Sequence, residues 1–179
     1  MSGGKRTMRI GVISDTHGRL DSQVLEEFRS VARILHAGDV GSEEVLLELS
    51  AVAQVIAVRG NVDGFPLTTR LREAEVVELA GVRFLIVHEV GRPENPLPEV
   101  RKLLDRHAPD LVIFGHTHQA CDVVAGGVRF FNPGAAGPRR FGRPRTIALM
   151  EISAEGEVEA RLLTLDDEAA GGRAGRRQA

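Results

Sequence analysis

Short apolar runs alternate with amphipathic segments along the first third of the chain. Three runs are apolar enough to form buried strands, at residues 8–14, 34–37 and 55–58. Two segments between them carry apolar side chains at helical spacing, at residues 21–28 and 42–49. Asp21 or Ser22 can cap the first of these helices. Because strands that alternate with helices favour right-handed crossovers, this part of the chain predicts three parallel strands.

The pattern changes after Gly64-Phe65-Pro66, where strand-like runs follow one another with few helices between them. Ala80-Gly81 and Gly126-Gly127 are turn signals of the kind that join hairpin strands. One helix is expected at residues 98–107. The expected strands are residues 75–79, 82–87, 111–114, 120–124, 128–132, 146–152 and 158–165. About ten strands are more than one parallel sheet would use, so we predict an α/β fold of two stacked mixed β-sheets, a sandwich flanked by α-helices.

The length of 179 residues suits one domain that buries a full core. We assign the domain to residues 8–165. Residues 1–7 are expected to be a flexible N-terminus. Residues 166–179 contain Gly, Ala and charged side chains without periodicity, so we expect a disordered tail there.

Composition narrows the class of protein. The net charge is −2, and the chain has no Trp and no Tyr, so binding of nucleic acid is not expected. The single cysteine excludes an internal disulfide framework and fits a reducing compartment. No apolar segment reaches the ~20 residues of a membrane span, and the N-terminus lacks signal-peptide features. We therefore expect a cytoplasmic protein without membrane contact, and a homo-oligomer is left open.

Polar clusters follow the apolar runs at the points where the expected strands end. Residues i and i+2 of an extended segment face the same way, so Asp15 and His17 can bind one metal ion together. Each cluster alone has an ordinary explanation, such as a helix cap at Asp39 or a left-handed turn at Asn61. Their order along the chain favours a metal site. The clusters are Asp15-Thr16-His17, Gly38-Asp39, Gly60-Asn61, the isolated His88, Gly115-His116-Thr117-His118 and the turn Asn132-Pro133-Gly134.

This ordered set resembles the calcineurin-like metallophosphoesterase superfamily, whose pattern runs D-x-H, G-D, G-N, H and G-H-x-H. The strings Asp-Thr-His-Gly, His-Ala-Gly-Asp, Gly-Asn-x-Asp and Asn-Pro-Gly are similar to its small bacterial and archaeal phosphodiesterase branch. That branch also includes the retromer scaffold subunit. The resemblance covers residues 8 to about 165 and implies the same two-sheet sandwich flanked by helices.

The resemblance implies two divalent metal ions in each chain. Mn²⁺ is our preferred ion, and Fe, Co, Ni or Zn are alternatives that suit the same mixed N and O ligands. Asp39, Asn61 and His88 would also position the substrate phosphate through the metals. A hydroxide between the ions would attack the phosphorus atom. The first ion would take Asp15, His17 and His118, the second would take Asn61, His88 and His116, and Asp39 would bridge them.

Two positions depart from the family pattern. Val62 stands where relatives that cleave poor leaving groups often have His, so we expect a preference for activated esters. Glu89 follows His88 where the family normally has Gly. A carboxylate there would repel a phosphate or add a ligand. Our hypothesis is that Glu89 turns away from the metals and that residues 93–98 form a lid over the pocket.

Several other polar residues have candidate supporting roles. Arg139 or Arg140 could clamp a substrate phosphate, whereas the alternative is that most of Arg139, Arg140, Arg143 and Arg145 form a solvated basic loop. His36 is expected to be a packed histidine at a strand end, and Asp63 is expected to hold the loop after Asn61.

These observations together predict a dinuclear metal-dependent phosphoesterase. It would hydrolyse small phosphodiesters or activated phosphate esters. The alternative is a metal-binding scaffold for protein interactions on the same fold, with little or no catalysis. All seven expected metal positions carry competent ligand side chains, which favours the enzyme.

Overall fold

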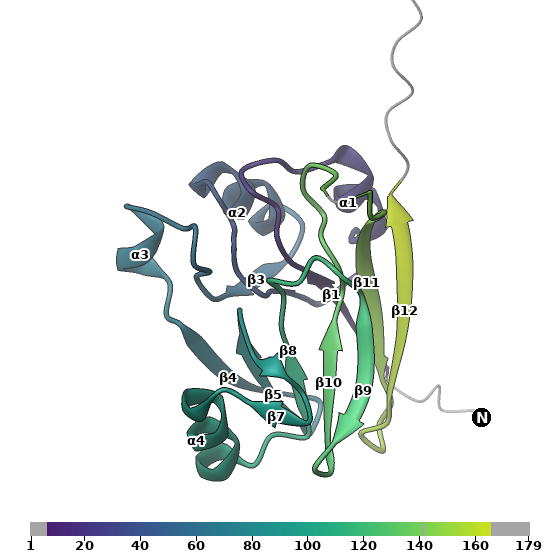
Figure 1. Cartoon of the computed structure of the whole chain (residues 1–179). Helices are drawn as coiled ribbons and strands as arrows, with labels where there is room; N and C mark the ends of the chain where they lie inside the picture. The colour runs from purple at the N-terminus through teal and green to yellow at the C-terminus, as the bar shows by residue number, and fades with distance from the viewer. Residues whose placement is uncertain (1–6, 141, 166–179) are drawn as a thin grey trace, which may run out of the picture.

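Two five-stranded sheets face each other in the computed structural model, which describes residues 7–140 and 142–165 (Figure 1). The first sheet has the strand order β12-β11-β1-β2-β3. Its strands are β1 (Met8–Ile13), β2 (Arg33–His36), β3 (Gln54–Ala57), β11 (Arg145–Ile152) and β12 (Val158–Leu165). As predicted, β1, β2 and β3 are parallel, whereas β11 and β12 are antiparallel to their neighbours.

The second sheet is also mixed and has the strand order β4-β5-β8-β10-β9. In it, β5, β8 and β10 are parallel, and the two outer strands are antiparallel. Its strands are β4 (Ala74–Leu79), β5 (Val82–Val87), β8 (Leu111–Ile113), β9 (Cys121–Ala125) and β10 (Val128–Asn132). Each sheet therefore contains three parallel strands whose carboxyl ends lie at one edge.

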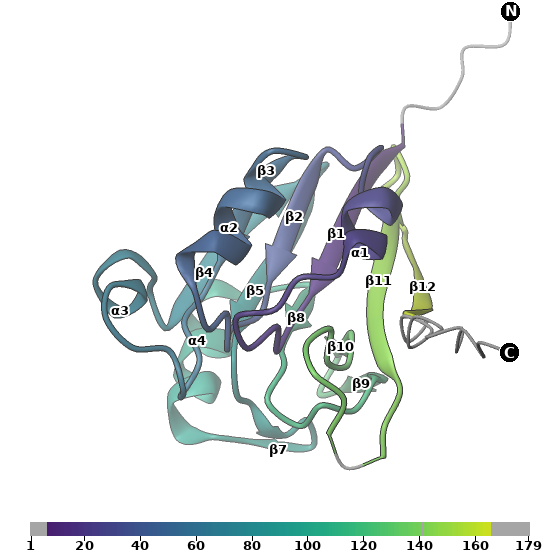
Figure 2. The ribbon, with the colours of Figure 1, turned by 90° about the horizontal axis from the view of Figure 1, so that it is seen from above.

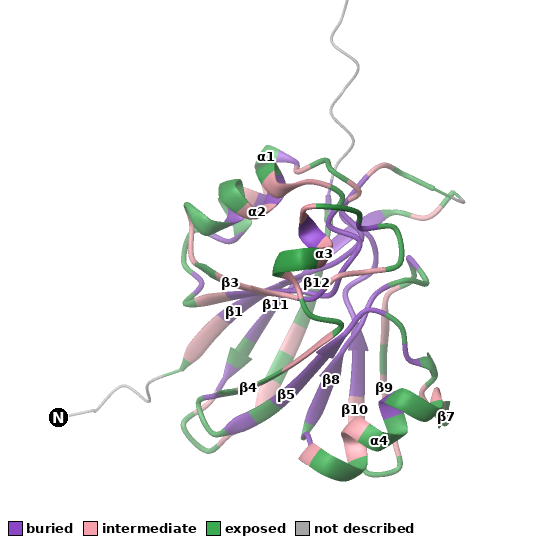
Figure 3. Cartoon of the chain, turned by 90° about the vertical axis from the view of Figure 1, so that its left-hand side faces the viewer, coloured by how far each residue is buried: buried purple, intermediate pink, exposed green. Residues whose placement is uncertain are grey.

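Helices cover the outer faces of the sandwich. Figure 2 shows α1 (Ser22–Glu27) and α2 (Glu43–Ser50) over the first sheet, and Figure 3 shows α4 (Pro98–His107) beside the second sheet. The predictions missed α3 (Leu67–Arg70) and the small hairpin of β6 (Gly91–Arg92) and β7 (Asn95–Pro96). These elements have two to four residues, which is too short to show a periodic pattern. No helix in the described part of the chain is long and apolar enough to cross a membrane.

Three apolar layers hold the helices and sheets together, because successive side chains of a strand point to opposite faces. Ile10 and Val12 of β1 pack between the sheets, whereas Ile13 packs against α1 and α2. In β5, Phe84 and Ile86 likewise face the first sheet, and the alternate residues face α4. The observed sandwich with outer helices confirms the predicted fold class. The predicted flexible segments lie outside the described residues, apart from residue 7.

A buried ion pair ties β11 to the start of α1. Arg145 donates a hydrogen bond to Asp21 Oδ2, and both side chains are buried. Asp21 Oδ1 accepts from the backbone N–H of Gln23, which confirms Asp21 as the helix cap. Arg145 is therefore not part of a solvated basic loop, the state expected of most of the four arginines. The sequence did not indicate this because the partner lies 124 positions away.

We expect Asp21→Asn to lower the free energy of unfolding by about 3–5 kcal/mol at pH 7, because it removes the carboxylate charge from the buried ion pair with Arg145. Urea denaturation measures this loss. Hydrogen bonding from Arg145 lowers the pKa of Asp21. The stabilisation is therefore present above the unfolded pKa of about 3.9 and is lost as the pH falls through the lower folded value. The difference in free energy of unfolding between the unchanged protein and Asp21→Asn should therefore shrink in acid.

The matched control is Glu151→Gln, which removes the exposed partner of Arg9. This change should cost less than about 1 kcal/mol. An Asp21→Asn protein as stable as the Glu151→Gln protein would contradict the role assigned to the buried pair.

Candidate metal centre

The first sheet brings four of the seven predicted ligands to its edge. Asp15 and His17 follow β1, Asp39 follows β2, and Asn61 follows β3. The loops interlock through backbone hydrogen bonds, such as that from the N–H of Asp15 to the carbonyl of Gly38 at 3.0 Å. The carboxyl ends of three adjacent parallel strands therefore place these side chains next to one another.

The second sheet supplies the three remaining ligands from the facing side. His88 follows β5, and His116 and His118 follow β8. The N–H of Gly115 donates to the carbonyl of His88 at 2.9 Å, and the N–H of His116 donates to Asp15 Oδ2 at 3.1 Å. The second of these bonds joins the two sheets directly at the site.

The backbone at the site is left-handed at most of these residues. Non-glycine residues seldom adopt positive φ, and such residues cluster at functional sites because the surrounding structure must hold them there. The sequence predicts that Asp15 and His17 converge from an extended segment. They do converge, but through left-handed turns. The five predicted ligands with positive φ are Asp15 (55°), His17 (49°), Asp39 (52°), His116 (67°) and His118 (54°).

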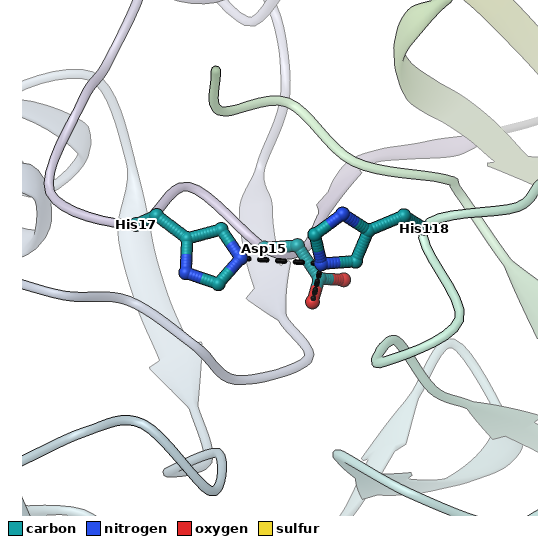
Figure 4. A group of neighbouring side chains, drawn as sticks. All are labelled: Asp15, His17 and His118. Carbon is teal, nitrogen blue, oxygen red and sulfur yellow. Dashed lines mark hydrogen bonds and ion pairs between the residues drawn. The ribbon is translucent and has the colours of Figure 1, made fainter. Parts of the chain in front are cut away.

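Asp15, His17 and His118 form one group, with their polar atoms turned toward one another (Figure 4). His118 Nε2 lies 3.2 Å from His17 Nε2 and 3.2 Å from Asp15 Oδ1. Asp15 Oδ1 is buried, and no described residue donates a hydrogen bond to it. A buried carboxylate oxygen facing two imidazole nitrogens is a donor set that fits a divalent cation.

Asn61, His88 and His116 form a second group. Asn61 Oδ1 lies 3.1 Å from His88 Nε2 and 3.1 Å from His116 Nδ1. The other ring nitrogen of His88, Nδ1, lies 2.8 Å from the carbonyl oxygen of Ala37, and a hydrogen bond there orients Nε2 toward the group. This arrangement of one carbonyl oxygen and two imidazoles also fits a borderline divalent metal.

Asp39 lies between the two groups. Its Oδ2 is 3.3 Å from His88 Nε2 and 4.0 Å from His17 Nε2. Its Oδ1 accepts a hydrogen bond from the N–H of Val62 at 3.1 Å. The carboxylate therefore reaches both groups at once.

Burial and charge set the protonation of these side chains. Burial raises the pKa of Asp15 to about 6 and, together with the charge of His17, lowers the pKa of His118 to about 4. Burial also lowers the pKa of His17, and the charge of Arg140 adds to this. At neutral pH the first group therefore consists of a carboxylate and two neutral imidazoles, the protonation states that metal binding needs.

Asp39 and His88 behave as a hydrogen-bonded pair. Burial opposes the charge on each of them, but their mutual hydrogen bond lowers the pKa of Asp39 and raises that of His88. Because a ligating imidazole must be neutral, the raised pKa of His88 opposes metal binding as the pH falls.

Comparison with known proteins identifies the family. Residues 8–155 match the calcineurin-like phosphoesterase superfamily domain. The chain belongs to this superfamily.

Individual members agree with this assignment. A probable metallophosphoesterase of Methanocaldococcus jannaschii is 32% identical, over 90% of this chain and 83% of that protein. Phosphodiesterase YfcE of Escherichia coli is 31% identical, over 80% of this chain and 88% of that protein. The structure of Vacuolar Protein Sorting 29 from Cryptosporidium parvum has the same fold, with a TM-score of 0.70 at 20% identity. The match covers 90% of this chain and 99% of that protein. Proteins of this superfamily are metallophosphoesterases, so divalent metal ions belong to its chemistry.

The glycines of the superfamily motifs make room for the acidic side chains. A Cβ atom on Gly60 would lie 2.0 Å from Asp39 Oδ1, and one on Gly115 would lie 1.9 Å from Ser14 Oγ and 2.7 Å from Asp15 Oδ2. At such distances a side chain at either position would have to displace its neighbours. The motifs G-N and G-H-x-H therefore contain glycine because the backbone passes directly beside a carboxylate.

Supporting residues fix the loops around the site. Asp63 accepts hydrogen bonds from the N–H groups of Val40, Gly41 and Gly60, which confirms that it holds the loop after Asn61. His36 is fully buried, as predicted, and its Nε2 lies 2.9 Å from Thr16 Oγ1.

Two further residues hold the first and last of the motifs. Asn132 Nδ2 donates to the carbonyl of Gly115 at 2.7 Å. Ser14, which the sequence motifs do not single out, donates to Asp15 Oδ2 at 2.6 Å. In the sequence, the role of Ser14 is indicated only by its position directly before the first motif. A serine is common at such a position by chance.

The structure corrects the hypothesis about Glu89. The side chain does not turn away, since Glu89 Oε1 lies 3.6 Å from His116 Nε2. The side chain is about half exposed, at 48%. Of the predicted lid at residues 93–98, Leu97 lines the neighbouring cavity, whereas residues 95 and 96 form β7.

The arginines after the Asn-Pro-Gly turn divide into different environments. Arg139 and Arg140 are exposed, and the charge of Arg140 lowers the pKa of both His17 and His118. Arg143 is half-buried and donates a hydrogen bond to the carbonyl of Thr117. Arg140 and Arg143 therefore bring positive charge to the His118 side of the site.

We expect Gly115→Ala to weaken metal binding by at least about tenfold, because the new Cβ must displace Asp15 or its partner Ser14. Isothermal titration calorimetry with Mn²⁺ measures the change. Gly64→Ala is the matched control, because nothing lies within 4 Å of a Cβ atom there. Equal Mn²⁺ affinities of the two variants would contradict the close-approach argument.

Proposed function

We propose that this protein is a dinuclear metal-dependent phosphodiesterase that hydrolyses phosphodiesters or activated phosphate esters. The observation that carries the proposal is the pair of ligand groups, three side chains each, that meet at the Asp39 carboxylate. Membership of the metallophosphoesterase superfamily and the likeness to a named phosphodiesterase support it.

The two groups suggest how the ions would be shared. Asp15, His17 and His118 would hold the first ion, and Asn61, His88 and His116 would hold the second. Asp39 would bridge them, since its Oδ2 lies within 4.0 Å of an imidazole of each group. A shared carboxylate reduces the repulsion between two neighbouring cations.

When bound, two such ions supply a nucleophile from water at neutral pH and neutralise charge on the phosphoryl oxygens. The protein's own residues do the positioning. Asp39, Asn61 and His88 would place the phosphate by fixing the ions, and Arg140, with Arg139 beside it, would attract the phosphate through its charge.

The residue after Asn61 limits the choice of substrate. Val62 is 53% exposed and has no proton to give. Because the departing oxygen must then leave without help from this position, esters with good leaving groups are favoured.

Mn²⁺ as the bound ion, a cytoplasmic location and a homo-oligomer stay predictions.

The test is hydrolysis of bis-p-nitrophenyl phosphate by protein stripped with a chelator. We expect activity to be absent after stripping, to return with Mn²⁺, and to fall by at least about 10²-fold in Asp39→Ala, which lacks the bridging carboxylate. Glu159→Gln, at an exposed position of β12, is the control that should retain activity. Folded protein that shows no turnover with any of Mn²⁺, Fe²⁺, Co²⁺, Ni²⁺ or Zn²⁺ would favour the scaffold alternative.

A second prediction concerns the leaving group. We expect turnover of glycerol phosphate to be at least about 10²-fold slower than that of p-nitrophenyl phosphate, because no acid stands at position 62. Phosphate release under identical metal loading measures both rates. Comparable rates would show that another group protonates the leaving oxygen.

A further inference from the structure

A cavity of about 760 Å³ opens beside one half of the candidate metal centre. Asn61 and His88 line it at one end, and α4 forms its far wall. Figure 1 shows α4 next to β4 and β5, on the side of the sandwich toward α3. The volume is within the range of small-molecule sites, which is about 300–1,000 Å³. A phosphate held at the metal centre would therefore have room for a bulky substituent on this side.

Apolar side chains make up the inner wall of this cavity. They come from β4, β5, α4 and the residue directly before α4, and they are Ala74, Val87, Val100, Leu103 and Leu97. Val87 and Val100 are buried, and the other three are half-buried. Contact with such a wall stabilises a bound apolar or aromatic group, because apolar surface is removed from water. It does not stabilise a charged group, which loses its hydration without gaining a polar partner.

Charged side chains line the cavity as well. Arg59 is paired with Glu73 at 2.5 Å, so its charge is already compensated. Lys102, Arg106 and Glu99 are exposed on α4, where solvent and salt screen them. Positive charge close to the metal centre comes instead from the loop with Arg140, on the His118 side.

Glu89 lies where the cavity meets the metal centre. It lines the cavity together with His88, and its Oε1 is 3.6 Å from His116 Nε2. A carboxylate at this junction opposes any further negative charge that a substrate brings into the cavity.

We propose that this cavity binds one ester arm of a phosphodiester, that the arm is uncharged and aromatic, of aryl to nucleoside size, and that Glu89 selects diesters over monoesters. This inference rests on the proposed function and names the substrate class of the same site. A diester carries one negative charge and presents a neutral arm to Glu89 and to the apolar wall. A monoester near neutral pH carries close to two charges and has only one arm, so it brings an additional negative charge to the centre beside Glu89.

Binding of phosphinates to the Mn²⁺-loaded protein tests the apolar wall without turnover, because their P–C bonds cannot be hydrolysed. We expect diphenylphosphinate to bind at least about tenfold more tightly than dimethylphosphinate, because its phenyl group is buried in the cavity. Leu103→Ala removes part of the wall and Ala74→Leu fills the space, so each should reduce this ratio by about three- to tenfold. Leu162→Ala, on β12, is the control and should leave the ratio unchanged.

The role of Glu89 is tested with diphenylphosphinate, which has the charge of a diester, and phenylphosphonate, which has that of a monoester. We expect Glu89→Gln to shift the ratio of their dissociation constants toward phenylphosphonate by roughly five- to tenfold, because the repelling charge is gone. Glu159→Gln, with the same change on β12 outside the cavity, should not shift it. If Glu89→Gln instead weakens Mn²⁺ binding in calorimetry, Glu89 is a metal ligand and its proposed role in selection is overturned.

The outcomes separate this inference from the proposed function. Metal-dependent hydrolysis of bis-p-nitrophenyl phosphate with unchanged ratios in folded Leu103→Ala, Ala74→Leu and Glu89→Gln proteins would overturn the inference alone. If the affinity ratios shift in these variants but the protein hydrolyses no ester, the proposed function is overturned. The inferred binding specificity of the cavity would still hold. Thermal unfolding of each variant establishes that it is folded, and Ala74→Leu tests the wall independently if Leu103→Ala is unstable.

Discussion

The carboxyl ends of two sets of parallel strands meet at one edge of this sandwich, and the site depends on that constraint. The first set supplies Asp15 and Asp39, and the second supplies most of the imidazoles that face them. Carboxylates are costly to bury without partners. The same groups also cross-link the sheets, since Asp15 accepts from the backbone of His116 and His88 bonds with the carbonyl of Ala37. Apolar packing therefore holds the two sheets together in the core, and polar contacts hold them together at the candidate metal centre.

Local strain and close approach are the cost of this arrangement. Five of the candidate ligands have left-handed backbone, and a side chain at either of the two glycines beside the carboxylates would displace its neighbours. Such conformations persist because the surroundings hold them. Asp63 fixes two of the loops at once through three backbone N–H groups, and Asn132 fixes the loop after β8. The site is therefore preorganised by residues that would not themselves touch a substrate.

The two sides of the metal centre differ chemically. The side of His118 has the positive charge of Arg140, whereas the side of His88 opens on an apolar cavity with Glu89 at its mouth. A ligand with a charged centre and a neutral bulky arm fits this division. Within a superfamily whose motif residues set the chemistry, such surroundings would set the choice of substrate.

The sequence alone was enough to predict the main helices and strands, the two-sheet architecture and the family, because periodic apolar runs and motifs at strand ends are local signals. The short elements α3, β6 and β7 carried no such signal. Which atoms meet depended on the tertiary structure, which turned Glu89 toward His116 and buried Arg145 against Asp21. It also placed the apolar wall of α4 beside His88. Local pattern determines which face of an element a side chain occupies, and only the packing of distant elements determines what that side chain touches.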